Sequence, residues 1–197
     1  MTAAPLQVAV ASSVYPGETE SGDAAVVRDV PGATLVAAID GLGHGHDAAG
    51  AARAVVAVLE ATGAEPLQTV VQRCHVAATE TRGAALTLAS FDAQRPRMAW
   101  LAVGNVAGVL VRGAGARSSV VSRPGIVGSS LPALHPSEVA VEDGDLLVLA
   151  TDGLAAGFAK EVRHGEPPQD CAERLLARFA TGGDDALVVV ARYARVG

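Results

Sequence analysis

The chain of 197 residues is poor in aromatic side chains and cysteines, and it contains no run of basic residues. Aromatic residues make up 3% of the sequence and hydrophobic residues 50%, so a folded core must be built largely from Ala, Val and Leu. This composition argues against extensive disorder. The formal net charge of -6 and the singly scattered basic residues argue against nucleic acid or an anionic membrane as a partner.

The two cysteines, Cys74 and Cys171, lie far apart and lack the nearby partners of a zinc site or a redox pair. We expect both to be buried thiols, which fits a reducing cytosol. No apolar run approaches the roughly 18 residues that span a bilayer. Residues 1–14 also lack the pattern of a secretory signal. These features predict a soluble, cytoplasmic protein.

Strand-like and helix-like segments occur in groups and do not alternate. Apolar stripes predict helices at His46–Thr62, Pro66–Thr81 and Pro168–Thr181. Short β-type runs between turn residues predict strands at Leu6–Tyr15, Ala24–Asp29, Ala33–Ile39, Ala84–Phe91, Arg97–Val103, Val106–Arg112, Ser118–Ser122, Asp145–Ala150 and Ala186–Tyr193. This order favours antiparallel sheets with helices outside, an α+β fold of four αββα layers. The length suits one domain, residues 1–197.

Two connections are predicted from their turn residues. Gly104-Asn105 resembles a tight hairpin turn between the strands on either side of it. Residues Ser122–His135 are rich in Pro, Gly and Ser and predict a long surface loop.

Four aspartates stand beside glycines at the edges of apolar runs: Asp23, Asp40, Asp152 and Asp184. A single Asp-Gly after an apolar run is a common turn. Three acids placed equivalently on three central strands are better explained by a shared ligand. Clustered carboxylates repel one another unless hard divalent cations neutralise them. The pattern therefore predicts a dinuclear Mg²⁺ or Mn²⁺ site.

The glycines after Asp40 fit this interpretation. Gly41 lets its backbone carbonyl turn toward a cation, and Gly43 and Gly45 allow the main chain to approach phosphate or water closely. A nucleotide-binding loop is the alternative. The segment lacks the full dinucleotide fingerprint, and no Walker lysine follows it.

The ordered motifs resemble the metal-dependent type 2C protein serine phosphatases, in particular the bacterial SpoIIE-type branch and its small stressosome members. The resemblance runs from about residue 12 to 193 and rests on Ser21-Gly22-Asp23, Asp40-Gly41-x-Gly43-x-Gly45, Arg82-Gly83-Ala84, Gly104-Asn105-Val106, Thr151-Asp152-Gly153 and Asp184-Asp185-x-Leu187. It also implies the four-layer sandwich.

The resemblance implies roles for individual residues. Asp40 would bridge two Mn²⁺ or Mg²⁺ ions, with the Gly41 carbonyl on one of them. Asp152 and Asp184 would bind the other ion, and Asp23 would act near the metals, through water. Asp40, Asp152 and Asp184 would thus be the catalytic carboxylates. Water activated by the ions would attack phosphorus. Asp185 is a weaker candidate for an outer role.

One position departs from the family pattern. Many members have His directly after the metal-binding Asp-Gly, as a candidate acid for the leaving group, whereas this chain has Leu42. His44 and His46 are possible substitutes, since imidazole titrates near neutrality. The alternative is that both are solvated at a helix entry.

Other polar residues near the motifs have two interpretations. Arg82, Asn105 and Arg123 are candidates to contact phosphate or to order the site. For Arg82 the alternative is a loop salt bridge, and for Asn105 a turn residue.

The leading hypothesis is a Mn/Mg-dependent protein serine/threonine phosphatase. The resemblance implies phosphorylated STAS-domain proteins of a stressosome as partners, and a role in resetting a bacterial stress-signalling switch. One alternative is a non-catalytic phosphoprotein-binding module, which Leu42 favours and the retained Asp40, Asp152 and Asp184 oppose. Another is a small-molecule phosphatase or phosphodiesterase; a nuclease is disfavoured because the sequence is neither basic nor rich in aromatics.

Overall fold

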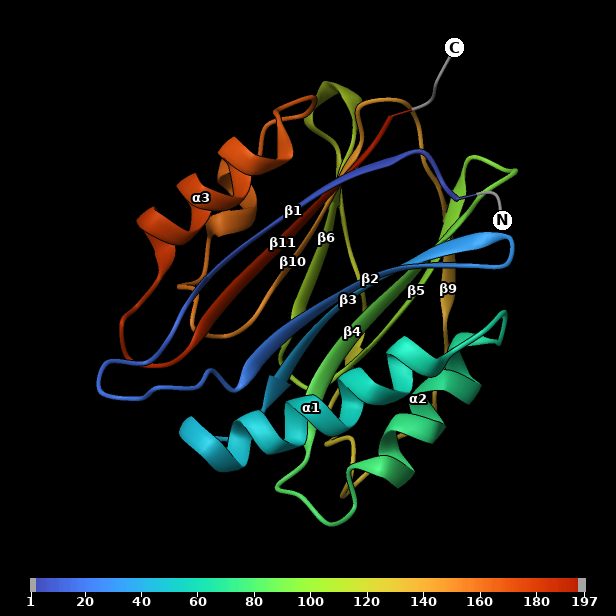
Figure 1. Cartoon of the computed structure of the whole chain (residues 1–197). Helices are drawn as coiled ribbons and strands as arrows, with labels where there is room; N and C mark the ends of the chain where they lie inside the picture. The colour runs from blue at the N-terminus through green and yellow to red at the C-terminus, as the bar shows by residue number, and fades with distance from the viewer. Residues whose placement is uncertain (1–2, 195–197) are drawn as a thin grey trace.

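Two β-sheets lie face to face in the structure, a computed structural model that describes residues 3–194 (Figure 1). The first sheet has the strand order β1-β11-β10-β6-β7, formed by Leu6–Ser13, Ala186–Tyr193, Leu146–Ala150, Ala107–Val111 and Arg117–Ser119. The second has the order β2-β3-β4-β5-β8, formed by Asp23–Val30, Ala33–Gly41, Ala84–Asp92, Arg97–Val103 and Ser122–Arg123. Strand β9 (Ser137–Ala140) also pairs with β5.

Helices cover both outer faces of this pair of sheets. Helices α1 (Gly45–Ala61) and α2 (Leu67–Ala77) pack on the second sheet, and α3 (Pro168–Phe179) packs on the first (Figure 1). Two short 3-10 helices, Gly113–Gly115 and Phe158–Glu161, lie in connections. The strand pairs are antiparallel except β5 with β8. The predicted αββα sandwich is confirmed. No helix within residues 3–194 has the length and apolarity to span a membrane.

The central strands are apolar on both faces because each lies between two cores. In β3, Leu35 and Ile39 join the core beneath α1 and α2. Val36 and Ala38 point the other way, into the core between the sheets. Strand β10 alternates in the same manner, with Leu149 between the sheets. Because successive strand residues face opposite sides, a continuous apolar run is the pattern of a strand buried on both faces.

The predicted hairpin at Gly104-Asn105 is wrong, because β5 and β6 belong to different sheets. The chain crosses from the second sheet to the first at this point. Gly104 has a φ of 91°, and a Cβ there would lie 2.5 Å from that of Ala85, so only glycine fits. The turn signal is real, but turn residues do not specify which sheet the next strand joins.

A second crossing divides the predicted strand Ser118–Ser122. Its beginning belongs to β7 in the first sheet, and Ser122 begins β8 in the second. The following segment, predicted as a surface loop, is in part held against the second sheet: Val127 is buried and pairs with Ala84.

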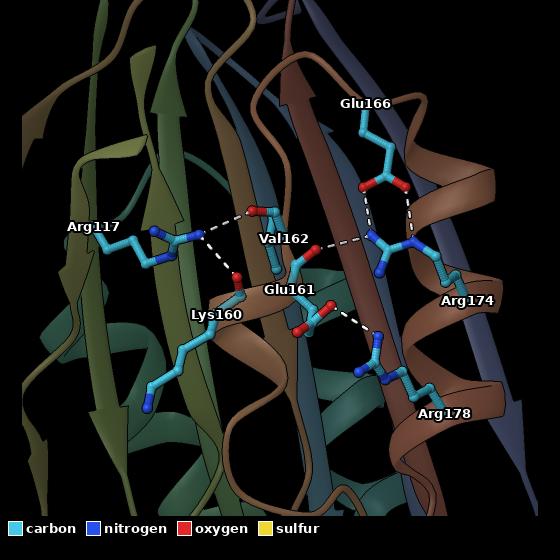
Figure 2. A network of polar contacts seen from close by, with 7 residues as sticks. All are labelled: Arg117, Lys160, Glu161, Val162, Glu166, Arg174 and Arg178. Carbon is cyan, nitrogen blue, oxygen red and sulfur yellow. Dashed lines mark hydrogen bonds and ion pairs between the residues drawn. The ribbon is translucent and has the colours of Figure 1, made fainter. Parts of the chain in front are cut away.

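Arginine side chains anchor the connection from β10 to α3 (Figure 2). Arg117, on β7, donates to three backbone carbonyl groups of this connection. Arg174, on α3, donates from two nitrogens to the Glu166 carboxylate, at 3.0 and 2.6 Å. Arg178 donates to the Glu161 carboxylate at 2.9 Å. The connection is thus fixed to the sheet on one side and to α3 on the other.

Candidate metal centre

Acids from both sheets meet at one end of the sandwich. In the second sheet, the register of β2 and β3 places Asp23 directly opposite Asp40. In the first sheet, Asp152 follows β10 and Asp184 precedes β11, and these two strands are neighbours. Thr151, which directly precedes Asp152, lies within hydrogen-bond distance of Asp23, so acids of the two sheets lie near one another.

Two neutral side chains donate hydrogen bonds to these acids. The Thr151 hydroxyl, at the end of β10, donates to Asp23 Oδ2 at 2.6 Å and so links the two sheets. Asn105, at the crossing between the sheets, donates from Nδ2 to Asp152 Oδ2 at 2.7 Å. Thr151 Oγ1 also accepts from the Leu187 backbone N–H at 2.9 Å, which fixes the hydroxyl. The sequence analysis assigned no role to Thr151, although this residue directly precedes Asp152.

Asp185 is a buried anchor of the surrounding loops. Its two carboxylate oxygens accept from the backbone N–H groups of Tyr15 at 2.8 Å and Gly22 at 2.7 Å. Its own N–H donates to Asp184 Oδ1 at 2.8 Å. Asp185 therefore ties the segment before β2 to the segment before β11. Its outer role near a metal stays a prediction.

Close packing of backbones explains two of the motif glycines. A Cβ on Gly41 would lie 2.1 Å from the carbonyl oxygen of Ala48 on α1. A Cβ on Gly153 would lie 1.9 Å from the carbonyl oxygen of Asp185. Both contacts are far inside van der Waals distance and both neighbours are backbone, so a larger residue would displace the segments that carry Asp40 and Asp152.

Burial and mutual repulsion disfavour charge on the acids. Burial, followed by the charges of Asp152 and Asp184, raises the pKa of Asp40 to about 7. Burial likewise raises the pKa of Asp23 to about 8, against the hydrogen bond from Thr151. Among residues 3–194, no Lys, Arg or His makes an ion pair with any of these four acids. The cluster thus gathers carboxyl groups whose ionisation no cationic side chain among residues 3–194 stabilises through an ion pair.

The chemistry of this donor set suits a hard divalent cation. The candidate ligands are carboxylate and carbonyl oxygens, which Mg²⁺ and Mn²⁺ prefer. Within residues 3–194, no three Asp, Glu, His or Cys side chains already form an arrangement that could hold a metal ion. The acids are gathered at one end of the fold, and closing a ligand shell requires their side chains to turn toward a common point.

The candidate proton donors have partners elsewhere. His44 Nδ1 lies 2.7 Å from Glu18 Oε1, and His46 Nδ1 lies 3.4 Å from Glu20 Oε1, both on the exposed surface. Leu42 is half-buried. The general acid therefore has no assignment from these contacts.

The candidate phosphate-contacting arginines also have other contacts. Arg82 Nη2 pairs with Asp47 Oδ2 at 2.7 Å, which agrees with the alternative of a loop salt bridge. Arg123 is exposed on β8, where its backbone carbonyl accepts from the Gly104 N–H at 3.0 Å. Asn105, in contrast, bonds directly to a candidate ligand.

Several known proteins resemble this chain. Phosphoserine phosphatase RsbX of Bacillus subtilis (strain 168) is 22% identical over 176 residues, 88% of each chain. The crystal structure of RsbX in complex with magnesium gives a TM-score of 0.85 at 20% identity over 96% of each chain. A chain solved in a study of the bacterial stressosome gives 0.85 at 29% identity, covering 95% of this chain and 99% of that one. The catalytic domain of serine/threonine phosphatase PstP with two manganese ions gives 0.74 at 20% identity, covering 96% and 99%.

Residues 31–194 match the model of the family described as Stage II sporulation protein E (SpoIIE). The matched range covers most of the chain, with every strand except β1 and β2, and it contains Asp40, Asp152 and Asp184. The resemblance inferred from the motifs is thereby confirmed at the level of the family. The chain belongs to the SpoIIE family and is a type 2C protein serine/threonine phosphatase.

Proposed function

We propose that this phosphatase depends on Mn²⁺ or Mg²⁺ and acts on phosphoserine or phosphothreonine of STAS-domain proteins in a stressosome, resetting a stress-signalling switch. The observation that carries the metal dependence is the set of acids from both sheets, gathered without a paired cation. The solved relatives that contain magnesium and manganese support it.

The ligand assignment is the one that the family resemblance implies, and the position of each acid at a strand end supports it. Asp40 and the Gly41 carbonyl, at the end of β3, would hold one ion. Asp152 and Asp184, on the neighbouring strands β10 and β11, would hold the second together with Asp40. Asp23, opposite Asp40, would act through water. When bound, the pair of ions supplies an activated water for in-line attack on phosphorus.

Residues of the chain itself prepare this site. The Asn105 amide occupies one oxygen of Asp152 and leaves the other available to a cation. Thr151 does the same for Asp23. Because the ions offset the charge of the acids, an acidic protein can bind an anionic phosphate without a basic surface.

The decisive experiment measures hydrolysis of para-nitrophenyl phosphate with added Mn²⁺. We expect activity that a chelator abolishes, and loss of at least about 100-fold in Asp40→Asn and Asp152→Asn. Asp170→Asn, an exposed acid in the first turn of α3, is the matched control and should retain wild-type activity. Chelator-resistant activity, or full activity in both site variants, would disprove the metal mechanism.

The substrate proposal rests on RsbX and on the relative from the stressosome study. Phosphate release should be measured from a phosphorylated STAS-domain protein, an unrelated phosphoserine peptide and a nucleotide, with equal substrate concentrations. The proposal requires a higher kcat/KM for the STAS-domain protein. A preference for the nucleotide would favour the small-molecule phosphatase instead.

A non-catalytic module is the second candidate, because Leu42 replaces the expected histidine and both nearby histidines contact glutamates. Calorimetric titration with Mn²⁺ distinguishes the metal-dependent enzyme from the non-catalytic module. Binding of two ions with turnover supports the enzyme, whereas tight phosphoprotein binding without metal or turnover supports the module.

A further inference from the structure

The structure contains a surface pocket of about 440 Å³. Its walls come from the first turns of α1 and from the connection between α2 and β4. The lining residues are His46, Asp47, Gly50, Glu80, Thr81 and Arg82. The volume lies in the range of pockets that hold a ligand group or a long side chain.

The pocket adjoins the candidate metal centre along the backbone. Gly41 pairs with Ala84 across β3 and β4, and the Leu42 N–H donates to the Gly83 carbonyl at 3.0 Å. Arg82 is therefore two residues along the chain from the position opposite Gly41. Two residues of chain span at most about 7 Å. The pocket therefore lies within reach of the second or third residue on one side of a phosphorylated residue that binds at the acids.

Gly50 lines the pocket, and the fold itself does not require a glycine at this position. It lies inside α1, where glycine costs about 1 kcal/mol relative to alanine. Its φ is not positive, and a Cβ there would meet only an Arg53 nitrogen, at 3.8 Å. Neither packing nor backbone conformation requires glycine. The missing side chain leaves space in the pocket, which is the property that a bound group would need.

One charged side chain on the rim of the pocket, Glu80, has no partner of opposite charge among residues 3–194. Asp47 and Arg82 neutralise each other at 2.7 Å, and His46 faces Glu20. Glu80 is exposed and, within residues 3–194, makes no hydrogen bond or ion pair. Its carboxylate is thus available to a cation that enters the pocket.

We propose that this pocket binds a lysine or arginine side chain of the phosphoprotein, two or three residues from the phosphorylated residue. This proposal rests on the proposed phosphatase function and adds a specificity determinant to it. The aliphatic stem would lie over Gly50, and the charged head would reach Glu80. Such a contact lets an acidic enzyme distinguish between phosphoproteins by a feature other than the phosphate.

The test uses phosphoserine peptides that differ only in having Lys or Ala two or three residues from the phosphoserine, on either side. For the wild type, we expect kcat/KM to be about two- to fivefold higher with Lys at one of these positions, the range of an exposed ion pair. Glu80→Gln should remove this preference. Gly50→Leu should remove it by filling the pocket, while raising the melting temperature because leucine favours the helix.

The control is Gly63→Leu, which adds the same side chain beyond the other end of α1, where a Cβ would meet no atom within 4 Å. It should keep the Lys preference. All variants should hydrolyse para-nitrophenyl phosphate like the wild type. Absence of any Lys preference in the wild type, or its persistence in Gly50→Leu and Glu80→Gln, overturns the pocket proposal. If the wild type does not hydrolyse para-nitrophenyl phosphate at all, the proposed phosphatase function itself is refuted.

Discussion

The side chain of Asn105, at a crossing point between the sheets, holds Asp152 in place. Asn105 reaches Asp152 because the chain changes sheets at Gly104, whose positive φ no other residue adopts without strain. The same amide also works to lower the pKa of Asp40. A neutral donor between two acids limits their repulsion and orients them.

Replacing Asn105 by alanine should weaken metal binding without unfolding the protein. Outer-shell partners of metal ligands typically contribute 10- to 100-fold to affinity. We expect the Kd for Mn²⁺ to rise by about tenfold, measured by calorimetric titration. The far-ultraviolet circular dichroism should be unchanged, because Asn105 is exposed. Unchanged affinity would show that the Asn105–Asp152 bond has no positioning role.

Asp23 should destabilise the metal-free protein at alkaline pH. Its folded-state pKa of about 8 exceeds the ordinary value of 3.8, mainly through burial. The protonated form therefore contributes stability below about pH 4, and this contribution is lost as pH rises toward 8. In the presence of a chelator, Asp23→Asn should be more stable than the wild type at pH 8, by about 1–3 kcal/mol in urea denaturation, and the gain should shrink at pH 5. Equal stability of the variant and the wild type at pH 8 would contradict the raised pKa of Asp23.

At the scale of elements, α3 and the connection before it support the Asp152 segment. The Ala155 N–H donates to the Phe179 carbonyl at the end of α3, and the Thr181 N–H donates to the Gly153 carbonyl. Asp152 lies near the start of the connection from β10 to α3. Arg174 binds the later part of this connection, through the Glu161 carbonyl and the Glu166 carboxylate (Figure 2). The arginine contacts therefore stabilise a connection whose first residues are part of the candidate site.

Replacing Arg174 by methionine should lower stability and should do so less in acid. Burial works to raise the pKa of Glu166, but the paired hydrogen bonds from Arg174 keep it below the ordinary value. The contribution of this pair is therefore present at neutral pH and lost as pH falls through the folded-state pKa of Glu166. We expect a loss of about 1–3 kcal/mol at pH 7, measured by urea denaturation, and a smaller loss near pH 4. Arg53→Met, on an exposed pair with Glu20, should cost less.

For the whole molecule, the candidate ligands come from both sheets, so an ion bound as proposed would connect the two halves of the sandwich. Binding to the folded state alone raises stability by mass action, about 2.7 kcal/mol at a concentration 100 times the Kd. Mn²⁺ should therefore raise the melting temperature of the wild type, measured by calorimetry. This increase in melting temperature should vanish in Asp40→Asn. The control variant Asp170→Asn should show the same increase as the wild type. A rise of equal size in Asp40→Asn would place the ion elsewhere.

The sequence by itself determined the layers of the fold and the list of candidate acids. Apolar stripes and continuous apolar runs are local patterns, so helices such as Leu67–Ala77 and buried strands such as β10 follow from periodicity. The Asp-Gly motifs lie at strand ends for the same reason. These signals need only a few neighbouring residues.

Only the tertiary structure decided which sheet each strand joins and what the acids contact. The crossings at Gly104-Asn105 and between β7 and β8 depend on packing between distant segments, and the local turn residues are the same for a hairpin and for a change of sheet. The bonds from Thr151 to Asp23 and from Asn105 to Asp152 join residues 128 and 47 positions apart. Their geometry follows from how two sheets stack, which no window of sequence contains.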